Sequence, residues 1–350
     1  MEDYSSAKLK AYVNDEGGGA SLNLSGKGLS RVPDAVTELT TVDELGLDNN
    51  NLTELPASIN KLKNLIKLHL NGNRLTELPA EIGDLKQLRW LDVSNNQLVG
   101  LPSSIRKLNQ LKELHLNGNT LAELPSEIGD LKELRGLFVS NNELVGLPTS
   151  IQKLKQLEEL HLSGNKIKEL PGEIGDLKGL LRLDVSNNQL VSLPTSILEL
   201  NQLEELYLSD NKLTEPPSEI GDLTELKRLD VSNNQLVGLS TRIKKLKQLE
   251  VLYLSDNKLT ELLSEIGDLK ELRRLDVSNN QLVGLSSSIQ KLKQLEELHL
   301  YGNKLTKLPA EIGDLKELRW LDVSNNRLVS LPTSIPVSYT HLTLPTIYSV

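Results

Sequence analysis

The sequence has no cysteine and only one phenylalanine and one methionine in 350 residues. Without thiols the chain can form neither a disulfide framework nor a cysteine-ligated metal site, and its composition suits a reducing compartment. Aromatic residues make up only 3% of the chain. A hydrophobic core must therefore be built almost entirely from Leu, Ile and Val.

Long apolar runs and basic blocks are also missing. No segment approaches the ~18 consecutive apolar residues of a membrane-spanning helix, and the N-terminal MEDYSSAKLKAYVNDEGGG lacks the apolar core of a signal peptide. The net charge is −9, and no Lys/Arg cluster offers the basic face that phosphate backbones require. We therefore expect a soluble, cytoplasmic protein with no membrane span and no nucleic-acid partner.

The dominant feature of the sequence is a repeat of 23 residues. From Leu39 to Val337 the chain divides into 13 consecutive segments of this length without an insertion. Apolar residues recur at positions 1, 4, 7, 9, 14, 17 and 21 of a segment such as 85–107, and position 12 is Asn in all 13. Self-similarity at such a period predicts a solenoid, because one segment alone cannot bury its apolar face.

Each segment predicts a strand, a turn and a short return. Positions 6 to 10 alternate between polar and apolar residues, which indicates a strand. The Asn at position 12, if buried, can satisfy backbone groups that no sheet ladder reaches. Position 18 is usually proline, and the return after it has room for a 3₁₀ turn or irregular chain but hardly for a full helix.

This repeat resembles that of the leucine-rich-repeat proteins. The pattern LxxLxxLxLxxNxLxxLPxxIxx is similar to the intracellular Ras-group members, and it extends into a degenerate first repeat at 20–36, where Lys27 replaces the asparagine. The resemblance implies an α/β-type leucine-rich-repeat solenoid (horseshoe), with a parallel β-sheet on the concave face and short 3₁₀ or irregular convex segments. It also implies a protein partner in signalling: a small GTPase, or a kinase or phosphatase complex.

The repeat pattern divides the chain into three parts. Residues 1–19 are expected to form an N-terminal cap, with a short helix from Ser5 or Ser6 through Val13 and a Gly-rich loop. Residues 20–337 form the leucine-rich-repeat domain. Residues 338–350 form a non-repeat tail that resembles translated sequencing-adapter sequence, and we exclude it, His341 included, from functional reasoning. On this interpretation the natural protein continues with further repeats or another domain.

A second period of 46 residues lies above the first. Alternate segments carry HL or YL at positions 8 and 9 and end in E-I-G-D, whereas the intervening ones carry DV or FV and end in S-I-x-K or a variant. Proline is missing from position 18 at Ser240, Leu263 and Ser286, and Pro216-Pro217 puts a proline where a core leucine belongs. This part of the convex side is either a flexible or docking stretch or an outer turn under relaxed constraint.

Four of the five histidines stand in the same L-H-L context, at His69, His115, His161 and His299. Equal positions on adjacent parallel strands are neighbours, so position 8 should alternate donor with acceptor, as in His161, Asp184 and Tyr207. Position 6 should alternate minus with plus, as in Glu159, Arg182, Glu205, Arg228, Val251, Arg274 and Glu297, with an exception at Val251. Position 23 should do the same on the outer side, as in Asp84 and Lys107. The histidines are thus expected to belong to a self-complementary surface lattice.

Two chemical alternatives for the histidines are a metal array and acid–base catalysis. Successive histidines would lie two strands, or ~10 Å, apart, which is too far to share one ion. Acid–base catalysis by an Asp and His pair would also need a nucleophile and a pocket, which an open wall does not supply. We therefore expect no catalytic residue, no metal and no cofactor.

Binding residues are expected where the lattice is interrupted. Trp90 occupies position 6, Phe138 replaces the usual Asp at position 8, and Gly136 leaves the adjacent position 6 bare. With His115 and Glu113 around them, these residues resemble the aromatic anchor and polar rim of an interface hot spot. Drift in a recently duplicated array is the alternative. A second candidate patch combines Trp320, His299 and Tyr301, with Val251 and Tyr253 a few strands away.

The sequence thus predicts a monomeric, non-enzymatic interaction module that presents its concave face to a protein partner, as an intracellular signalling scaffold. The alternative is a ligand-binding fragment of a larger receptor or enzyme, whose effector domain lies beyond the C-terminal end of this sequence.

Overall fold

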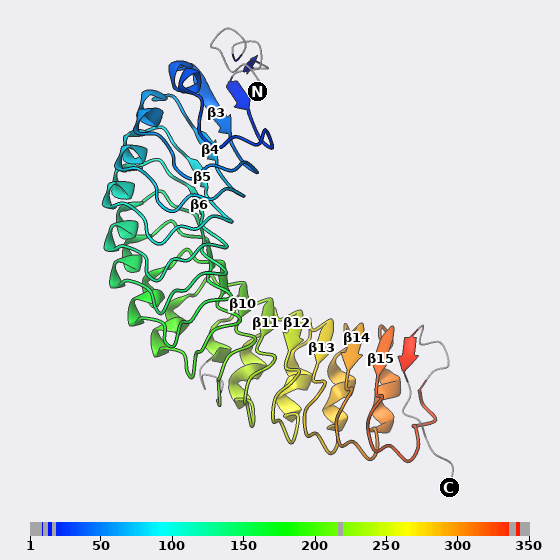
Figure 1. Ribbon diagram of the computed structural model, residues 1–350. Helices are drawn as coiled ribbons and strands as arrows, with labels where there is room; N and C mark the ends of the chain where they lie inside the picture. Colours follow the sequence, from blue (N-terminus) through cyan, green and yellow to red (C-terminus); the bar gives the residue numbers. More distant parts are fainter. Residues whose placement is uncertain (1–8, 10–12, 16–18, 216–219, 336–340, 344–350) are drawn as a thin grey trace. The chain divides into compact units, whose positions relative to one another are not determined.

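The computed structural model describes residues 9, 13–15, 19–215, 220–335 and 341–343. The chain divides into two compact units, Met1–Leu180 (unit 1) and Leu181–Val350 (unit 2). In both, one repeat contributes a short strand and a 3₁₀ helix on opposite faces (Figure 1). This is the solenoid that the repeat predicts, and the short 3₁₀ convex segments are confirmed.

Unit 1 contains eight strands in its described residues. Neighbouring strands from β2 to β8 are parallel and in register at a spacing of 23 residues from β3 onward, whereas β1 pairs with β2 antiparallel. In Figure 1 the strands line the inner side of the bend of this unit, with the 3₁₀ helices outside. The elements are β1 (Val13–Asp15), β2 (Ala20–Asn23), η1 (Asp34–Glu38), β3 (Val42–Gly46), η2 (Ala57–Lys61), β4 (Lys67–His69), η3 (Ala80–Asp84), β5 (Trp90–Asp92), η4 (Ser103–Lys107), β6 (Glu113–His115), η5 (Ser126–Asp130), β7 (Gly136–Phe138), η6 (Thr149–Lys153), β8 (Glu159–His161) and η7 (Gly172–Asp176).

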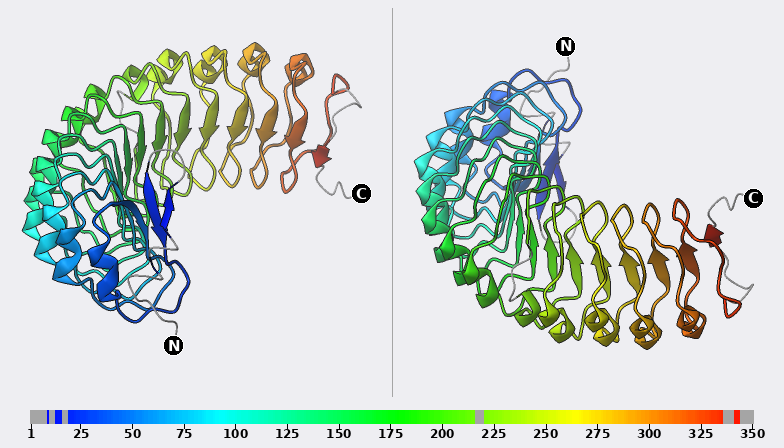
Figure 2. Two further views of the ribbon diagram at one scale, coloured as in Figure 1. Left: turned by 90° about the horizontal axis from the view of Figure 1, so that it is seen from above. Right: turned by 90° about the horizontal axis from the view of Figure 1, so that it is seen from below.

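Unit 2 repeats the arrangement, with parallel strands on one face and 3₁₀ helices on the other (Figure 2). Its elements are β9 (Arg182–Asp184), η8 (Thr195–Glu199), β10 (Glu205–Tyr207), η9 (Ile220–Asp222), β11 (Arg228–Asp230), η10 (Thr241–Lys245), β12 (Val251–Tyr253), η11 (Ser264–Asp268), β13 (Arg274–Asp276), η12 (Ser287–Lys291), β14 (Glu297–His299), η13 (Ala310–Asp314), β15 (Trp320–Asp322) and β16 (His341–Thr343).

The turn after each strand depends on the residue at position 11, which adopts a left-handed conformation. Asn95 has φ 53° and Gly118 has φ 66°, and the same position is Asn, Asp or Gly in the other repeats with positive φ. These residue types tolerate that region best. The Gly-Asn pair after each L-H-L is therefore a turn requirement and carries no catalytic meaning.

A ladder of buried asparagines joins the coils. Asn119 accepts a hydrogen bond from the backbone N–H of Leu98 at 2.9 Å and donates to the carbonyls of Val93 and Leu116 at 3.0 Å. Val93 and Leu98 belong to the preceding coil, so the amide closes gaps between coils that the short strands leave open. Asn142, Asn165, Asn211 and Asn234 repeat this pattern. The role predicted for position 12 is thus observed.

The core of each unit is aliphatic. The Leu, Ile and Val residues at the repeating apolar positions are almost all buried, and many are fully inaccessible, such as Leu111, Leu114 and Ile128 in unit 1. Full burial of such a side chain contributes roughly 1.5–3 kcal/mol. Stacked coils therefore hold one another by burial that a single coil cannot achieve.

The residue at position 18 is a proline in η1 to η8 and in η13, where it is the N-cap of the 3₁₀ helix. Pro125, for example, has φ −66° and ψ 152°, and its carbonyl accepts from the N–H of Ile128 at 3.0 Å. Where proline is missing, Ser240 and Ser286 cap η10 and η12 through their side-chain oxygens. The helix also forms after Leu263. The convex side thus keeps its 3₁₀ helices in this stretch, while Pro216-Pro217 lies outside the described residues.

Close packing on the convex side supplies a physical basis for the 46-residue period. A Cβ on Gly129, in the E-I-G-D segment, would overlap the carbonyl oxygen of Ser150 and stand 2.9 Å from its Cβ. Gly83, Gly267 and Gly313 meet a serine of the next coil in the same way. Gly221 meets the backbone carbonyl of Arg242 instead, so the glycine of E-I-G-D makes room for the backbone of the next coil.

The two ends differ from the repeat. Leu9 is buried, whereas 1–8, 10–12 and 16–18, which hold most of the predicted cap, lie outside the described residues. Val13–Asp15 form strand β1 where the predicted helix would have ended. In the predicted non-repeat tail, His341–Thr343 pair in parallel with β15, Trp320 opposite His341. This spacing of 21 residues departs from the repeat but still allows pairing.

Replacing Asn119 by Ala should destabilise the fold strongly, because buried donors and acceptors of two coils lose their partner. We expect a loss of ~2–4 kcal/mol in the free energy of unfolding, measured by urea denaturation followed by circular dichroism. Asn64→Ala is the control, since this exposed side chain makes one bond to the carbonyl of Thr40. Equal effects of the two substitutions would contradict the ladder's role.

Replacing Gly129 by Ala should also destabilise, because the added methyl has no room against the backbone of Ser150. The expected cost is about 1–3 kcal/mol. Gly146→Ala is the matched control, as nothing lies within 4 Å of its added Cβ. If the melting temperature of Gly129→Ala equals that of the control, glycine is not required for the convex packing.

Candidate functional site

The concave strand face of unit 1 carries a continuous stack of aromatic rings. Five rings from β4 to β8 follow one another with centroid separations of 6.4, 4.4, 4.3 and 4.8 Å, in the order His69, Trp90, His115, Phe138 and His161. The ring planes of His115 and Phe138 are nearly parallel, at 3° to each other. We call these five residues the ring stack. His115, Phe138 and His161 stack because residues 23 apart stand on adjacent strands ~4.8 Å apart, which is close to ring-stacking distance.

Trp90 joins the stack from a different position than its neighbours. Its backbone lies opposite Glu113 on β6, two residue pairs away from the Asp92–His115 pair. The indole reaches diagonally across to His115. Diagonal neighbours on adjacent strands are close enough for contact only when a side chain is long or aromatic. Its Nε1–H is enclosed and has no acceptor among the described residues. An unsatisfied buried donor costs the free protein about 1–3 kcal/mol.

Gly136 is covered by its neighbours, contrary to the expectation of a bare position. The residue is buried. A Cβ there would stand 2.6 Å from Cε2 of Phe138 and 2.9 Å from Cδ of Glu113. Glu113 on β6 thus leans across β7 and lays its carboxylate over the glycine. The absence of a side chain at 136 is what allows Phe138 and Glu113 to occupy this place.

Burial changes the ionisation of two groups in this region. It lowers the pKa of His115 below its ordinary value, with Asp92 opposing and His161 and His69 adding to the effect. Burial also raises the pKa of Glu113, and the charges of Glu159 and Glu158 raise it further, while Arg135 opposes. His115 is therefore a neutral aromatic ring at neutral pH, and Glu113 is a carboxylate that the fold disfavours.

The histidines pair with glutamates, not with the aspartates of neighbouring strands. Nε2 of His161 lies 3.2 Å from Oε2 of Glu159, and that of His299 lies 3.5 Å from Oε2 of Glu297. Residues i and i+2 of a strand project from the same face, so this glutamate is the nearer partner. Donors and acceptors do alternate strand by strand at position 8, as predicted and as seen at Asp184, Tyr207 and Asp230. The described histidines nevertheless contact glutamates of position 6.

The aspartates at position 8 have a different, local role. Asp92 accepts from the N–H of Ser94, two residues along, at 2.9 Å, and Asp184, Asp230, Asp276 and Asp322 do the same in unit 2. These bonds close the turn after the strand. In β7, where Phe138 stands instead, the N–H of Ser140 is bonded by Oδ1 of Asn117 from the preceding coil. The fold thus compensates for the aromatic substitution.

Position 6 shows the predicted charge alternation within unit 2. Arg182, Glu205, Arg228, Val251, Arg274 and Glu297 face one another strand by strand. Nε of Arg182 lies 2.9 Å from the carboxylate of Glu205. Burial would raise the pKa of Glu205, but the hydrogen bonds from Tyr207 and Arg182 outweigh it and lower this pKa. Burial and the hydrogen bond to Glu205 raise the pKa of Tyr207 to about 12. Position 23 pairs as predicted too: Lys107 lies 3.6 Å from Asp84.

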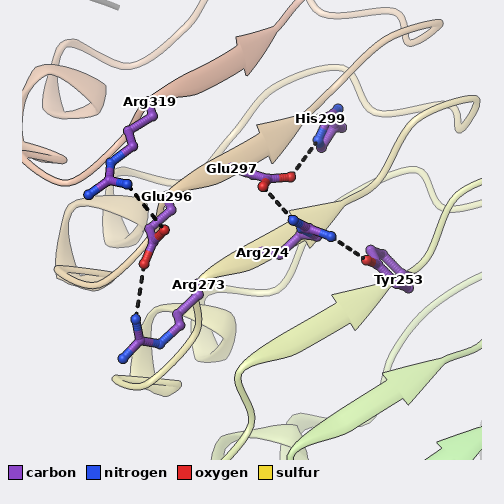
Figure 3. A network of polar contacts seen from close by, with 7 residues as sticks. All are labelled: Tyr253, Arg273, Arg274, Glu296, Glu297, His299 and Arg319. Atoms are coloured by element: carbon purple, nitrogen blue, oxygen red, sulfur yellow. Dashed lines mark hydrogen bonds and ion pairs between the residues drawn. The ribbon is translucent and has the colours of Figure 1, made fainter. Parts of the chain in front are cut away.

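Figure 3 shows the same compensation near the C-terminal end of unit 2. Arg274 contacts the carboxylate of Glu297 and donates to the hydroxyl of Tyr253 at 3.1 Å. Arg273 and Arg319 lie 3.0 and 4.0 Å from Glu296. Each carboxylate drawn therefore has an arginine beside it, and this surface is electrostatically satisfied.

The second predicted patch is more exposed but less connected than the ring stack. Trp320 and Tyr301 are 36% and 41% exposed, and the rings of His299 and Trp320 are 6.0 Å apart. Tyr253 is engaged by Arg274, and Val251 is half-buried. The structure does not assemble these residues into one continuous ring surface.

No other feature of the described residues suggests chemistry. Within them, no group of three or more His, Cys, Asp or Glu side chains is placed to hold a metal ion. No helix of the described part is long and apolar enough to cross a membrane. An open hollow beside the ring stack is lined by Asn23, Glu44, Gly46, Asp48 and His69, among others. Its acids are engaged: Lys67 lies 3.2 Å from Glu44, and Ser25 donates to Asp48.

Comparison with family models and curated proteins gives a consistent family and no named relative. The leucine rich repeat model matches residues 40–98, 109–167, 224–282 and 270–328. The model of two leucine rich repeat copies matches 86–127, and that of a leucine-rich repeat region matches 152–252. No curated protein sequence matches the chain.

Solved structures of the same fold come from several kingdoms. A leucine-rich repeat protein of Leptospira interrogans is 36% identical, with a TM-score of 0.74 over 94% of this chain and 95% of that one. A plant peptide hormone receptor, solved in complex with RGF2, is 31% identical, with a TM-score of 0.80 over 95% of this chain and 59% of the receptor. A Listeria monocytogenes internalin, at 21% identity, shares the fold. With family models covering more than half of its length, the chain belongs to the leucine-rich repeat family.

Proposed function

We propose that this protein is a non-enzymatic interaction module that binds a protein partner on the concave strand face of unit 1. The observation that carries the proposal is the ring stack. Leucine-rich repeats are in general interaction modules, and the plant receptor that this chain resembles was solved with a peptide bound. The open, ring-lined wall suits the recognition of a surface or an extended segment.

The ring stack has the physical properties of an interface anchor. Each ring is held by its neighbours, so little side-chain entropy is lost when a partner binds. Trp is among the residues most enriched where alanine substitution costs the most binding energy. Because the ring faces contact one another, the stack offers the partner its edges together with polar groups of Glu113 and Glu159. The ring edges thus form a preorganised apolar centre, and the glutamates form a polar rim around it, as at other protein interfaces.

We further propose that the protein works in the cytoplasm as a signalling scaffold of the Ras-group type, with a small GTPase or a kinase or phosphatase complex as its partner. The support is the 23-residue repeat pattern together with the absence of cysteine. A second function is favoured by the receptor comparison, in which this chain spans 59% of the receptor's length. On that proposal the chain is the ligand-binding part of a larger receptor or enzyme.

Replacing Trp90 by Ala together with Phe138 by Asp should abolish partner capture and leave folding nearly unchanged. Asp is chosen for position 138 because β11 and β13 carry Asp at the equivalent position. There its carboxylate accepts a hydrogen bond from the N–H of the Ser two residues later. Capture is measured by affinity purification with quantitative mass spectrometry, and folding by circular dichroism and melting temperature.

Val99→Asp is the matched control, since it places the same charge on a side chain that is 69% exposed and is not part of the ring stack. This variant should capture the same proteins as the parent. Undiminished capture by the double variant would refute the proposed role of the ring stack. Loss of capture in Trp320→Ala alone would transfer that role to unit 2.

A further inference from the structure

We propose that the partner bound at the ring stack places a cationic side chain, arginine in particular, against the carboxylate of Glu113 where it lies over Gly136. This inference rests on the proposed function and names the chemistry that the partner must supply. It follows from a difference in charge between the strand faces of the two units, from the position of the Glu113 carboxylate and from the stack that lies beside it.

Unit 2 shows how the repeat normally neutralises its position 6 carboxylates. Glu205 stands between Arg182 and Arg228, and Glu297 is paired with Arg274. In unit 1 the corresponding residues of β6, β7 and β8 are Glu113, Gly136 and Glu159. The arginine found at this position on β9, β11 and β13 is thus replaced on β7 by a residue without a side chain.

The cations nearby do not take the place of the missing arginine. Arg135, which precedes β7, donates Nη1 to Glu158 at 2.9 Å. Nε2 of His115 lies 3.8 Å from Glu113 without a hydrogen bond, and burial keeps the pKa of its imidazole low. Glu113 is therefore an incompletely compensated carboxylate at neutral pH, and it remains partly accessible, at 29% of its side chain.

The position of the carboxylate favours a forked donor. Glu113 leans across Gly136, so its oxygens lie over β7, about one strand spacing of ~4.8 Å from β8. A guanidinium has five donors in one plane and can bind both oxygens of one carboxylate together, whereas an ammonium acts as a point charge.

The ring stack determines which cation fits. The methylene groups of an arginine side chain would lie along the edges of His115 and Phe138, while the charged end reaches Glu113. Long cationic side chains commonly bury their stems on apolar surface in this way. A bare metal ion lacks such a stem, and the described residues offer no three-ligand group for one. An arginine presented by an extended peptide segment satisfies both features.

The test is selection of a display library of random linear peptides on the full chain, followed by affinity measurements on synthetic winners. We expect arginine to be enriched at one position of the selected peptides. Its replacement by citrulline, a neutral isostere, should weaken binding about tenfold or more, as should Glu113→Gln. Glu205→Gln, the equivalent change in unit 2, should leave affinity unchanged.

Charge reversal gives the sharper criterion. Glu113→Lys should reject the arginine peptide and recover affinity for the peptide carrying glutamate at that position. Peptides that depend on Trp90 and Phe138 but show no cationic enrichment, or that bind Glu113→Gln equally well, would overturn the inference and leave the proposed function standing. A library that yields no peptide dependent on Trp90 and Phe138 would overturn both.

The same charge difference predicts opposite stability effects in the two units. The pKa of Glu113 is raised, so ionisation of this carboxyl destabilises the fold as pH rises through that pKa. The pKa of Glu205 is lowered, so ionisation of this carboxyl stabilises the fold above the ordinary carboxyl range. At neutral pH, Glu113→Gln should therefore raise the melting temperature and Glu205→Gln should lower it. Both differences should fade as pH falls through the pKa of each group. A lower melting temperature for Glu113→Gln would show that Glu113 is retained for stability.

Discussion

The whole architecture depends on the buried asparagine that each coil contributes. Strands of three residues form few ladder bonds, so the coils would be poorly joined on the strand side alone. The amide of Asn119 bonds backbone groups of its own coil and of the one before it. This contact fixes adjacent coils in register, and register decides which side chains meet across the strand face. The ring stack and the charge rows both follow from it.

The period of 46 residues combines two constraints on opposite faces. On the convex side, glycines such as Gly129 leave room for the backbone of the next coil, which packs directly against them. On the strand face of unit 2, arginines alternate with glutamates except at Val251, since like charges on adjacent strands would repel. A sequence that alternates two kinds of coil satisfies both demands. An exception on one face, as at Phe138, is tolerated while the other face keeps its packing.

The region around Phe138 shows how such a regular array accommodates a local exception. The aspartate that closes the turn is lost there, and Asn117 of the preceding coil bonds Ser140 instead. The arginine at position 6 is also lost, and Glu113 moves over the vacant position. The result is an aromatic surface beside the carboxylate of Glu113, whose ionisation the fold disfavours. The proposed role of Glu113 in binding would explain why the protein keeps a residue that lowers its stability. Perturbed ionisation of this kind is typical of functional sites.

The sequence alone determined the fold family, the coil boundaries, the parallel register and the residues that face the strand side, because a repeat of fixed length leaves each position one environment. It also singled out Trp90 and Phe138 as interruptions of a pattern. Only the tertiary structure decided how side chains of adjacent coils fill the space that register gives them. It placed His115 between the two aromatic rings, laid Glu113 over Gly136 and paired His161 with Glu159 instead of an aspartate. Side-chain direction depends on the sizes and charges of several neighbours at once, which a one-dimensional period does not specify.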